Sequence, residues 1–125
     1  ADIISKAHPA WEKHQHPATR CFQAIRIFIN NELKDIEVFL SQVLDVLAPG
    51  GRLCVISFHS LEDRIVKRFM QYEAKGDPFP SDFPITHDQC NPRLRIIANS
   101  KPTKAEVQEN TRSRSARLRV AEKIV

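Results

Sequence analysis

Four residues with reactive or ring-stacking side chains follow a strongly apolar run in the middle of the chain. The run over 52–58 is rich in β-branched residues, which is typical of a parallel strand covered on both faces. In open α/β sheets, ligands bind beyond the carboxyl ends of the strands. That end carries Ser57, Phe58, His59 and Ser60. Histidine exchanges protons near neutral pH and phenylalanine stacks on planar rings, so this strand end is a candidate active cleft.

The same residues have plainer interpretations. The run Ser60-Leu-Glu-Asp63 matches a capping box, the pattern that opens a helix. Ser60 is then only a helix cap, while Glu62 and Asp63 are only charges of the first turn. Phe58 is then only a core residue.

A group of cations near the C-terminus is the second candidate. Residues 93–125 contain 9 basic and 3 acidic residues, whereas residues 1–92 contain 10 basic and 12 acidic residues. Such a basic segment favours an anionic partner, with nucleic acid as the first candidate, although a solvated basic face has the same composition. Four cations between the last two predicted strands can reach phosphates: Lys101, Lys104, Arg112 and Arg114.

A polar stripe on the first predicted helix, over 17–30, is the third candidate. Apolar residues cluster on one side of this helix, and Pro17 suits its first position. The opposite stripe contains Thr19, Gln23 and Arg26, with Arg20 at its edge. This stripe faces either a partner or solvent. Arg20 opposes the helix dipole, which favours a specific partner.

Metal ligation is a weaker hypothesis. His8, His14 and His16 are close in sequence, and His87-x-x-Cys90 resembles half a site, but no further motif completes a tetrahedral set. We therefore expect no metal. Three cysteines without a C-x-x-C motif fit a reducing compartment, and Cys54, in mid-strand, is expected to be a small core residue.

The glycine content excludes one class of site. The chain has only Gly50, Gly51 and Gly76, so a glycine-rich nucleotide loop of the dinucleotide-binding or Walker type cannot lie in these 125 residues. No apolar run approaches the ~20 residues of a membrane span, and the N-terminus lacks the apolar core of a signal peptide. Because the only methionine is Met70, we expect the chain to be part of a longer protein.

The predicted elements bring two of the candidates to one side of a sheet. Residues 1–15 are mixed, with Pro9 interrupting any helix. The patterns then predict helices over 17–30 and 32–48, a strand over 52–58, a helix from Ser60, a loop over 76–92, a strand over 94–98, an irregular stretch over 99–113 and an antiparallel strand over 115–124. This order resembles the end of a doubly wound α/β domain. If the strand over 94–98 runs parallel to that over 52–58, the cations emerge beside Phe58.

Three segments together resemble a known family: His16–Ile27, Leu47–Lys67 and Arg112–Arg119. They resemble the bacterial S-adenosylmethionine-dependent 16S rRNA (cytosine-N4) methyltransferase family, known as MraW or RsmH. The resemblance covers residues 10–125 in the right order. A Pro-Gly-Gly turn before a strand is common among methyltransferases, whereas the run over 57–64, Ser-Phe-His-Ser-Leu-Glu-Asp-Arg, is much more particular.

The resemblance implies an α/β fold, the C-terminal part of a Rossmann-like methyltransferase domain with its last strand antiparallel. Residues 1–15 are then the tail of a helical insertion, and residues 16–125 are the C-terminal half of the domain. The family's glycine-rich cofactor loop precedes this stretch, so we expect no cofactor-binding residue here, although the parent protein uses S-adenosylmethionine. The implied parent is cytoplasmic and modifies 16S rRNA of the small ribosomal subunit, and the fragment alone is expected to be inactive.

The resemblance also suggests roles for the candidate residues. The exocyclic amine of cytosine is a poor nucleophile, so the site must align it with the methyl group and accept its N–H as charge develops. His59 and Ser57 are the candidates for this catalytic work. Phe58 and Ser60 would contact the base or its strand. The remaining RNA-binding candidates are Arg20, Gln23, Arg26, Lys101, Lys104, Arg112 and Arg114.

Two further hypotheses stand beside this one. The rival from another class is a basic, non-enzymatic RNA-binding module that uses the C-terminal arginines, and it predicts RNA binding without cofactor binding. The second concerns the strand over 52–58, which lacks a neighbour if the preceding strand is missing. An unpaired apolar edge invites self-association.

Overall fold

The computed structural model describes residues 1–7, 15–79, 82 and 84–125, and these residues form two compact units. The first unit is Ala1–Asp35 and the second is Ile36–Val125. The first unit contains α1 (Asp2–Ala7), α2 (Thr19–Asn30) and the start of α3 (Glu32–Val46). The short helix α1 lies in the stretch whose residue pattern is mixed, and Pro9, which we expected to interrupt any helix there, lies outside the described residues.

The second unit is built on a sheet of three strands in the order β1-β3-β2. Its strands are β1 (Arg52–Ser57), β2 (Leu94–Ser100) and β3 (Arg117–Lys123). The central strand, β3, pairs antiparallel with both neighbours. It follows that β1 and β2 run parallel, as predicted, but are separated by β3. The mixed α/β class, with an antiparallel last strand, is confirmed.

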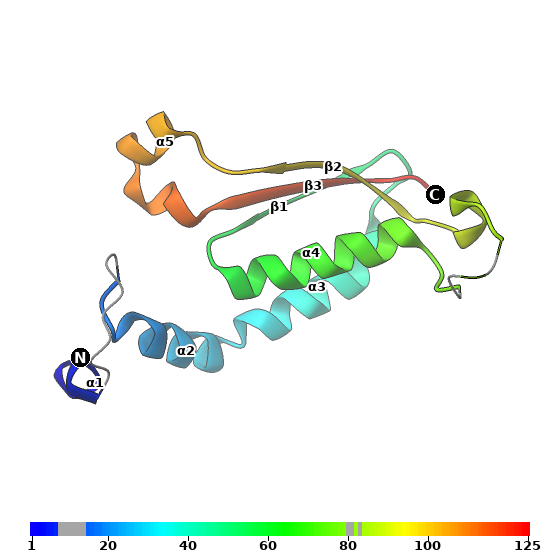
Figure 1. The fold of residues 1–125 in the computed structure, drawn as a ribbon. Coiled ribbons are helices and arrows are strands. Elements are labelled where there is room, and N and C mark those ends of the chain that lie inside the picture. The colour runs from blue at the N-terminus through cyan, green and yellow to red at the C-terminus, as the bar shows by residue number, and fades with distance from the viewer. Residues whose placement is uncertain (8–14, 80–81, 83) are drawn as a thin grey trace. The chain divides into compact units, whose positions relative to one another are not determined.

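One face of the sheet is covered by α3 and by α4 (Ser60–Lys75), as Figure 1 shows. The helical period of apolar residues on α3 and α4 supplies the buried side chains that face the strands. This core consists of Leu40, Val43, Leu44, Leu53, Val66, Met70, Leu94 and Ala121. Ile65 and Phe69 of α4 are partly buried and also pack against this core.

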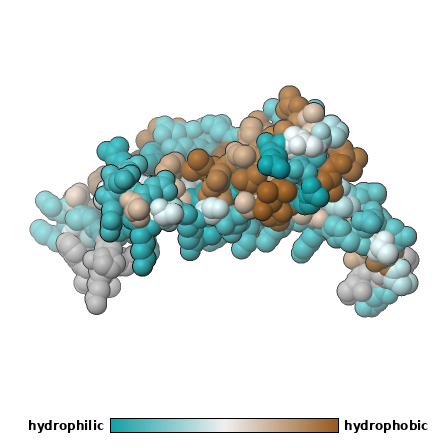
Figure 2. All heavy atoms as spheres, turned by 90° about the horizontal axis from the view of Figure 1, so that it is seen from above, coloured by the Kyte–Doolittle hydropathy of each residue, from teal (hydrophilic) through white to brown (hydrophobic). Residues whose placement is uncertain are grey.

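The other face of the sheet is exposed over β1, so the prediction of a strand covered on both faces is wrong for the described residues. Leu53 and Ser57 are buried, whereas Cys54 and Ile56, which alternate with them, are exposed. Cys54 is therefore not the core residue that we expected. An apolar run does not show whether one face of a strand is covered or both, because the inner face is apolar in either case. In Figure 2, apolar side chains gather over this outer face of the sheet.

The turn after α3 joins the helix to the sheet. Gly50 has a φ of 81°, and its N–H donates to the Lys123 carbonyl at 2.7 Å. The ammonium group of Lys123 donates to the carbonyls of Leu44 and Leu47 at 2.5 and 2.8 Å. A cation at these free carbonyls is favourable at a helix C-terminus, so one β3 residue closes the end of α3.

Local hydrogen bonds move several predicted boundaries. The helix α2 begins at Thr19 rather than Pro17, and the predicted loop over 76–92 contains the short 3-10 helix η1 (His87–Cys90). The largest correction concerns the stretch that we predicted to be mostly irregular. It folds into α5 (Lys104–Glu109) and the 3-10 helix η2 (Thr111–Ser115), which delays the start of β3 to Arg117.

No helix in the described part of the chain is long and apolar enough to cross a membrane.

Candidate functional site

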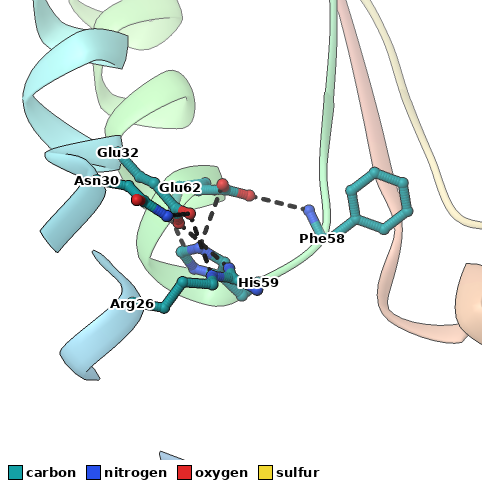
Figure 3. Close-up of polar contacts among 6 residues, drawn as sticks. All are labelled: Arg26, Asn30, Glu32, Phe58, His59 and Glu62. Atoms are coloured by element: carbon teal, nitrogen blue, oxygen red, sulfur yellow. Dashed lines mark hydrogen bonds and ion pairs between the residues drawn. The ribbon is translucent and has the colours of Figure 1, made fainter. Parts of the chain in front are cut away.

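The N-cap residue of α4 is His59, not Ser60. His59 has extended backbone dihedrals, and its Nδ1 accepts from the Glu62 N–H at 3.4 Å. The Glu62 carboxylate in turn accepts from the Phe58 N–H at 3.1 Å (Figure 3). This arrangement resembles a capping box with histidine in the place of serine, except that the carboxylate accepts from the residue before the cap and not from the cap itself. The capping box predicted from Ser60 is wrong because Ser60 is already the first helical residue, and the extended residue before it, His59, provides the cap.

The cap determines how the reactive residues are held. His59 Nδ1 is an acceptor, which places the proton of the neutral ring on Nε2. That atom lies 3.2 Å from Glu62 Oε1, at an angle that makes no hydrogen bond. Glu62 therefore fixes the backbone of Phe58 and lies beside the imidazole of His59. The Phe58 side chain is 55% exposed, whereas the neighbouring Ser57 is 3% exposed and faces the core.

A pocket of about 670 Å³ lies on the outer face of the sheet, at the carboxyl ends of β1 and β2. Its floor contains Ile56, Leu118 and Ser100. These residues are neighbours because Leu118 of the central strand β3 is paired with Ile56 of β1 and with Ser100 of β2. Its walls come from the segment between β2 and β3. The full lining is Ile56, Phe58, Ser100, Lys101, Pro102, Glu106, Asn110, Arg112, Ser113, Ala116 and Leu118.

The pocket brings together three residues that we predicted from distant parts of the sequence: Phe58, Lys101 and Arg112. Their meeting follows from the parallel direction of β1 and β2, whose carboxyl ends lie at the same edge. The lining does not include the other candidates of this unit. These are Ser57, His59, Ser60, Lys104 and Arg114.

Two polar pocket residues, Glu106 and Asn110, were missed by the sequence reasoning. Thr103 caps α5 by accepting from the Glu106 N–H at 3.2 Å, and the Asn110 N–H donates to the Glu106 carbonyl at 2.8 Å. Asn110 then accepts from the Ser113 hydroxyl at 2.7 Å. The pattern Thr103-x-x-Glu106 before this turn was the available signal, because it matches a helix start.

A two-pronged ion pair fixes the start of α4 on the sheet. Arg119 of β3 donates from Nε and Nη2 to the Asp63 carboxylate at 2.6 and 2.9 Å. These hydrogen bonds hold the pKa of Asp63 below its ordinary value, against the opposing effect of burial. They also raise the pKa of Arg119. Asp63 is thus more than a charge of the first turn, because it holds the cap next to the pocket in place.

The polar stripe of α2 forms a separate feature within the first unit. Thr19, Phe22, Gln23 and Arg26 line a shallow hollow of about 390 Å³, which includes two of the three RNA-binding candidates on this helix. Arg26 Nη2 donates to Glu32 at 3.2 Å (Figure 3). Arg20 is exposed on the same helix but is not part of the hollow.

The histidines weighed as metal ligands have other surroundings or lie outside the described residues. His87 Nε2 lies 3.0 Å from the Ala74 carbonyl, and Cys90 Sγ lies 3.8 Å from the Thr86 carbonyl. His8 and His14 are not among the described residues. His87 therefore joins η1 to the end of α4, whereas the Cys90 thiol contacts the residue that caps η1.

Comparison with known proteins identifies the family. The sequence model of the MraW methylase family matches residues 1–124. This chain belongs to the MraW methylase family. The match covers all the elements described above, including the pocket and the cap of α4.

Individual relatives agree with this family. The chain is 54% identical, over 99% of its length, to the ribosomal RNA small subunit methyltransferase H of Legionella pneumophila strain Paris. It is 54% identical to the protein of the same name from Marinomonas sp. and 53% identical to that of Chromohalobacter salexigens. The chain spans only 41%, 39% and 38% of the length of these three relatives. It thus corresponds to part of such a protein.

Proposed function

We propose that this chain is part of a cytoplasmic, S-adenosylmethionine-dependent methyltransferase that modifies N4 of a decoding-region cytosine in 16S rRNA. The observation that carries the proposal is membership of the MraW methylase family across residues 1–124. The relatives named as small-subunit rRNA methyltransferases support it. We infer that this chain contributes contact with RNA, through the pocket at the carboxyl ends of β1 and β2.

The three predicted residues in the pocket have complementary roles toward RNA. Phe58 offers an exposed ring on which an unpaired base stacks. Lys101 and Arg112 supply positive charge for a phosphate of the same strand. An aromatic ring beside two cations matches the chemistry of a single-stranded nucleotide, which has one planar and one anionic part.

The cofactor is expected to bind elsewhere in the protein, because the glycines of this chain serve the fold. The N–H groups of Gly50 and Gly51 donate to the carbonyls of Lys123 and Ala48 at 2.7 and 2.8 Å. The Gly76 N–H donates to the Tyr72 carbonyl at 3.1 Å. We therefore expect the S-adenosylmethionine site to lie outside these 125 residues, and we derive no step through it.

The catalytic roles of Ser57 and His59 stay predictions. His59 Nδ1 already accepts the Glu62 N–H, so proton acceptance by this atom requires the first turn of α4 to open. Positioning of Phe58 through Glu62 needs no such change. Ser57 is 3% exposed, and its hydroxyl therefore reaches a substrate only after local rearrangement.

Methylation of small ribosomal subunits by the full-length protein tests the proposal. Subunits that lack the modification are incubated with the protein and S-adenosylmethionine, and their nucleosides are examined by mass spectrometry for N4-methylcytidine. We expect methylation with the full-length protein and none with the 125-residue chain alone. RNA binding without methyl transfer and without S-adenosylmethionine binding in calorimetry would instead support the rival RNA-binding module.

Self-association of the isolated chain is a further part of the proposal. In the described residues β1 is an edge strand, and its outward residue Ile56 is 61% exposed. An apolar edge of this kind favours pairing with a second copy. Light scattering on the 125-residue chain should detect a species larger than a monomer, and Ile56→Lys should shift it toward the monomer. A monodisperse monomer at high concentration argues against the pairing.

A further inference from the structure

The side of α4 that faces away from the sheet carries four exposed cations. Every residue of α4 is described, and none of its acids is exposed. With 3.6 residues per turn, the cations fall on one side of the helix, opposite the buried Val66 and Met70. They extend for about 16 Å along the helix axis. We call them the basic face, which consists of Arg64, Lys67, Arg68 and Lys75.

The acids of α4 do not neutralise this face, because the fold uses them elsewhere. Glu62 holds the N–H of Phe58, and Asp63 is held by Arg119. Glu73 is 6% exposed, and a guanidinium of β2's approach contacts both of its carboxylate oxygens at 2.6 and 2.7 Å. In the part of the chain that the structure describes, the side chains of the basic face make no hydrogen bond or ion pair.

The spacing of these cations does not serve the stability of the helix. Opposite charges one turn apart stabilise a helix, whereas like charges destabilise it. Arg64 and Arg68 are like charges one turn apart. The only acid one turn from a cation of this face is Asp63, four residues before Lys67, and Arg119 already holds both of its oxygens. The arrangement concentrates positive potential on one side of α4, which favours an anionic partner.

We propose that the basic face of α4 binds the phosphate backbone of a double-stranded RNA segment, as a second contact apart from the pocket. Because the proposed function makes a ribosomal subunit the partner, this inference rests on it. The pocket lies on the outer face of the sheet, whereas α4 covers the other face (Figure 1). The two contacts therefore belong to different parts of a folded RNA.

The basic face fits a duplex better than a single strand. Its cations recur on a rigid helix with a pitch of about 5.4 Å, which suits a regular row of phosphates. Single strands are held by aromatic rings among the cations. Here Gln71 lies among the cations, and the exposed ring of Tyr72 lies at the edge of the face. Double-stranded RNA is recognised by shape and phosphates, and such contacts orient a protein without reading sequence.

An RNA duplex and one of its own strands are matched probes for the full-length protein. The strand is chosen so that it does not fold on itself, and binding is measured by fluorescence anisotropy. Arg64→Ala with Arg68→Ala should weaken duplex binding at least about tenfold at physiological salt and reduce its salt slope by about 1.8. Binding of the single strand, which the pocket holds, should change less than about twofold.

The pocket provides a control that removes the same charge. Lys101→Ala with Arg112→Ala should weaken binding of the single strand and change duplex binding less than about twofold. Arg64→Lys with Arg68→Lys keeps the charges, so its duplex affinity should stay within about threefold of that of the wild type. Unchanged duplex binding in the Arg64→Ala, Arg68→Ala protein would overturn the proposal. An equal loss in the pocket variant would also overturn it, because net charge alone would then explain both.

Thermal melting gives a second measurement, which does not depend on RNA. The Arg64→Ala, Arg68→Ala protein should melt no lower than the wild type, because alanine favours a helix and a pair of like charges is removed. A markedly lower melting temperature would mean that the arginines pack against the rest of the full-length protein. That result would overturn the proposal.

Binding and methylation of small subunits separate this proposal from the proposed function. Weaker binding of subunits by the Arg64→Ala, Arg68→Ala protein, with unchanged duplex binding, would assign the face to a ribosomal protein and overturn the proposal. Methylation by the wild type, with no effect of this variant on duplex binding, would end the proposal and leave the proposed function intact. Duplex binding that depends on Arg64 and Arg68, without methylation by the wild type, would end the proposed function and leave a protein with two RNA-binding surfaces.

Discussion

Single side chains around the start of α4 carry more of the site than their types suggest. The Glu62 carboxylate accepts from the backbone N–H of Phe58, and the Glu62 N–H donates to the imidazole of His59. The position of Phe58 and the cap of α4 therefore both depend on Glu62. Asp63, the next residue, ties the same turn to β3 through Arg119. The exposed ring of Phe58 is thus supported by two carboxylates that do not enter the pocket themselves.

Replacing Phe58 tests its predicted stacking. Phe58→Ala should weaken binding of single-stranded RNA to the full-length protein by about 1–3 kcal/mol, the usual contribution of base–aromatic stacking. Fluorescence anisotropy at fixed ionic strength measures the change. Tyr72 is 59% exposed on α4 and does not line the pocket, so Tyr72→Ala is the control. Equal affinities of the Phe58→Ala and wild-type proteins would contradict the stacking role.

The Asp63–Arg119 pair predicts a specific pH dependence of stability. Asp63→Asn should lower the free energy of unfolding by about 1–2 kcal/mol at neutral pH, because the charged hydrogen bonds are lost. The pKa of Asp63 in the folded state lies below its ordinary value of 3.8. The stabilisation is therefore complete above that value and disappears as the pH falls through the lowered folded pKa.

Urea unfolding of both proteins between neutral and acidic pH measures this difference. The two unfolding curves should converge at the acidic end. Asp45→Asn, at an exposed position of α3, should show no comparable pH-dependent difference. A difference between Asp63→Asn and wild type that stays constant down to the lowest pH would rule out the ion pair as its source.

At the scale of elements, the ends of helices decide where the pocket walls and loops lie. Thr103 starts α5 and Asn110 starts η2, and these two short helices turn a polar segment into a wall of the pocket. The ammonium group of Lys123, on β3, donates to a carbonyl in the last turn of α3. Gly76, with a φ of 76°, follows the last residue of α4. The caps of α5 and η2 are local in the sequence, whereas the contact of Lys123 with the end of α3 joins residues far apart in the sequence.

The end of α4 gives a sharp test of close backbone approach. A Cβ at Gly76 would overlap the Cys90 carbonyl oxygen, and the positive φ adds strain. Gly76→Ala should therefore destabilise the protein by at least about 2 kcal/mol. Gly50→Ala is the matched control, because Gly50 also has a positive φ but nothing lies within 4 Å of its Cβ position. It should cost only about 1 kcal/mol.

Thermal and denaturant unfolding of the two glycine variants compare these effects. A similar loss of stability in both would mean that backbone strain, and not contact with Cys90, limits residue 76. A stability of Gly76→Ala equal to that of the wild type would contradict the packing of α4 against η1.

At the scale of the whole molecule, two positively charged side chains lie together at the carboxyl ends of β1 and β2. The basic last third of the chain is folded so that Lys101 and Arg112 share a pocket with Phe58. Other basic side chains of that third are used by the sheet itself. Arg95 of β2 pairs with Glu122, as does Arg52 of β1, and these contacts hold the pKa of Glu122 below its usual range.

The salt dependence of RNA binding tests whether Lys101 and Arg112 contact phosphates. Each phosphate contact to a single strand contributes about 0.7 to the slope of log affinity against log salt concentration. Replacing both Lys101 and Arg112 by alanine should therefore reduce the slope by about 1.4. Lys75, exposed at the end of α4, is the control for loss of a cation away from the pocket. An unchanged slope in the double variant would mean that neither cation contacts phosphate.

The sequence by itself determined the order of the main elements, the parallel direction of β1 and β2, and the candidates Phe58, Lys101 and Arg112. These features depend on local periodicity and on topological rules, which can be read along the chain. Only the tertiary structure decided that β3 lies between β1 and β2, that His59 caps α4, and that Glu106 lines the pocket. The reason is physical: strand order and outer-face exposure depend on contacts between residues far apart in sequence, and the cap depends on which residue is the last with extended backbone dihedrals.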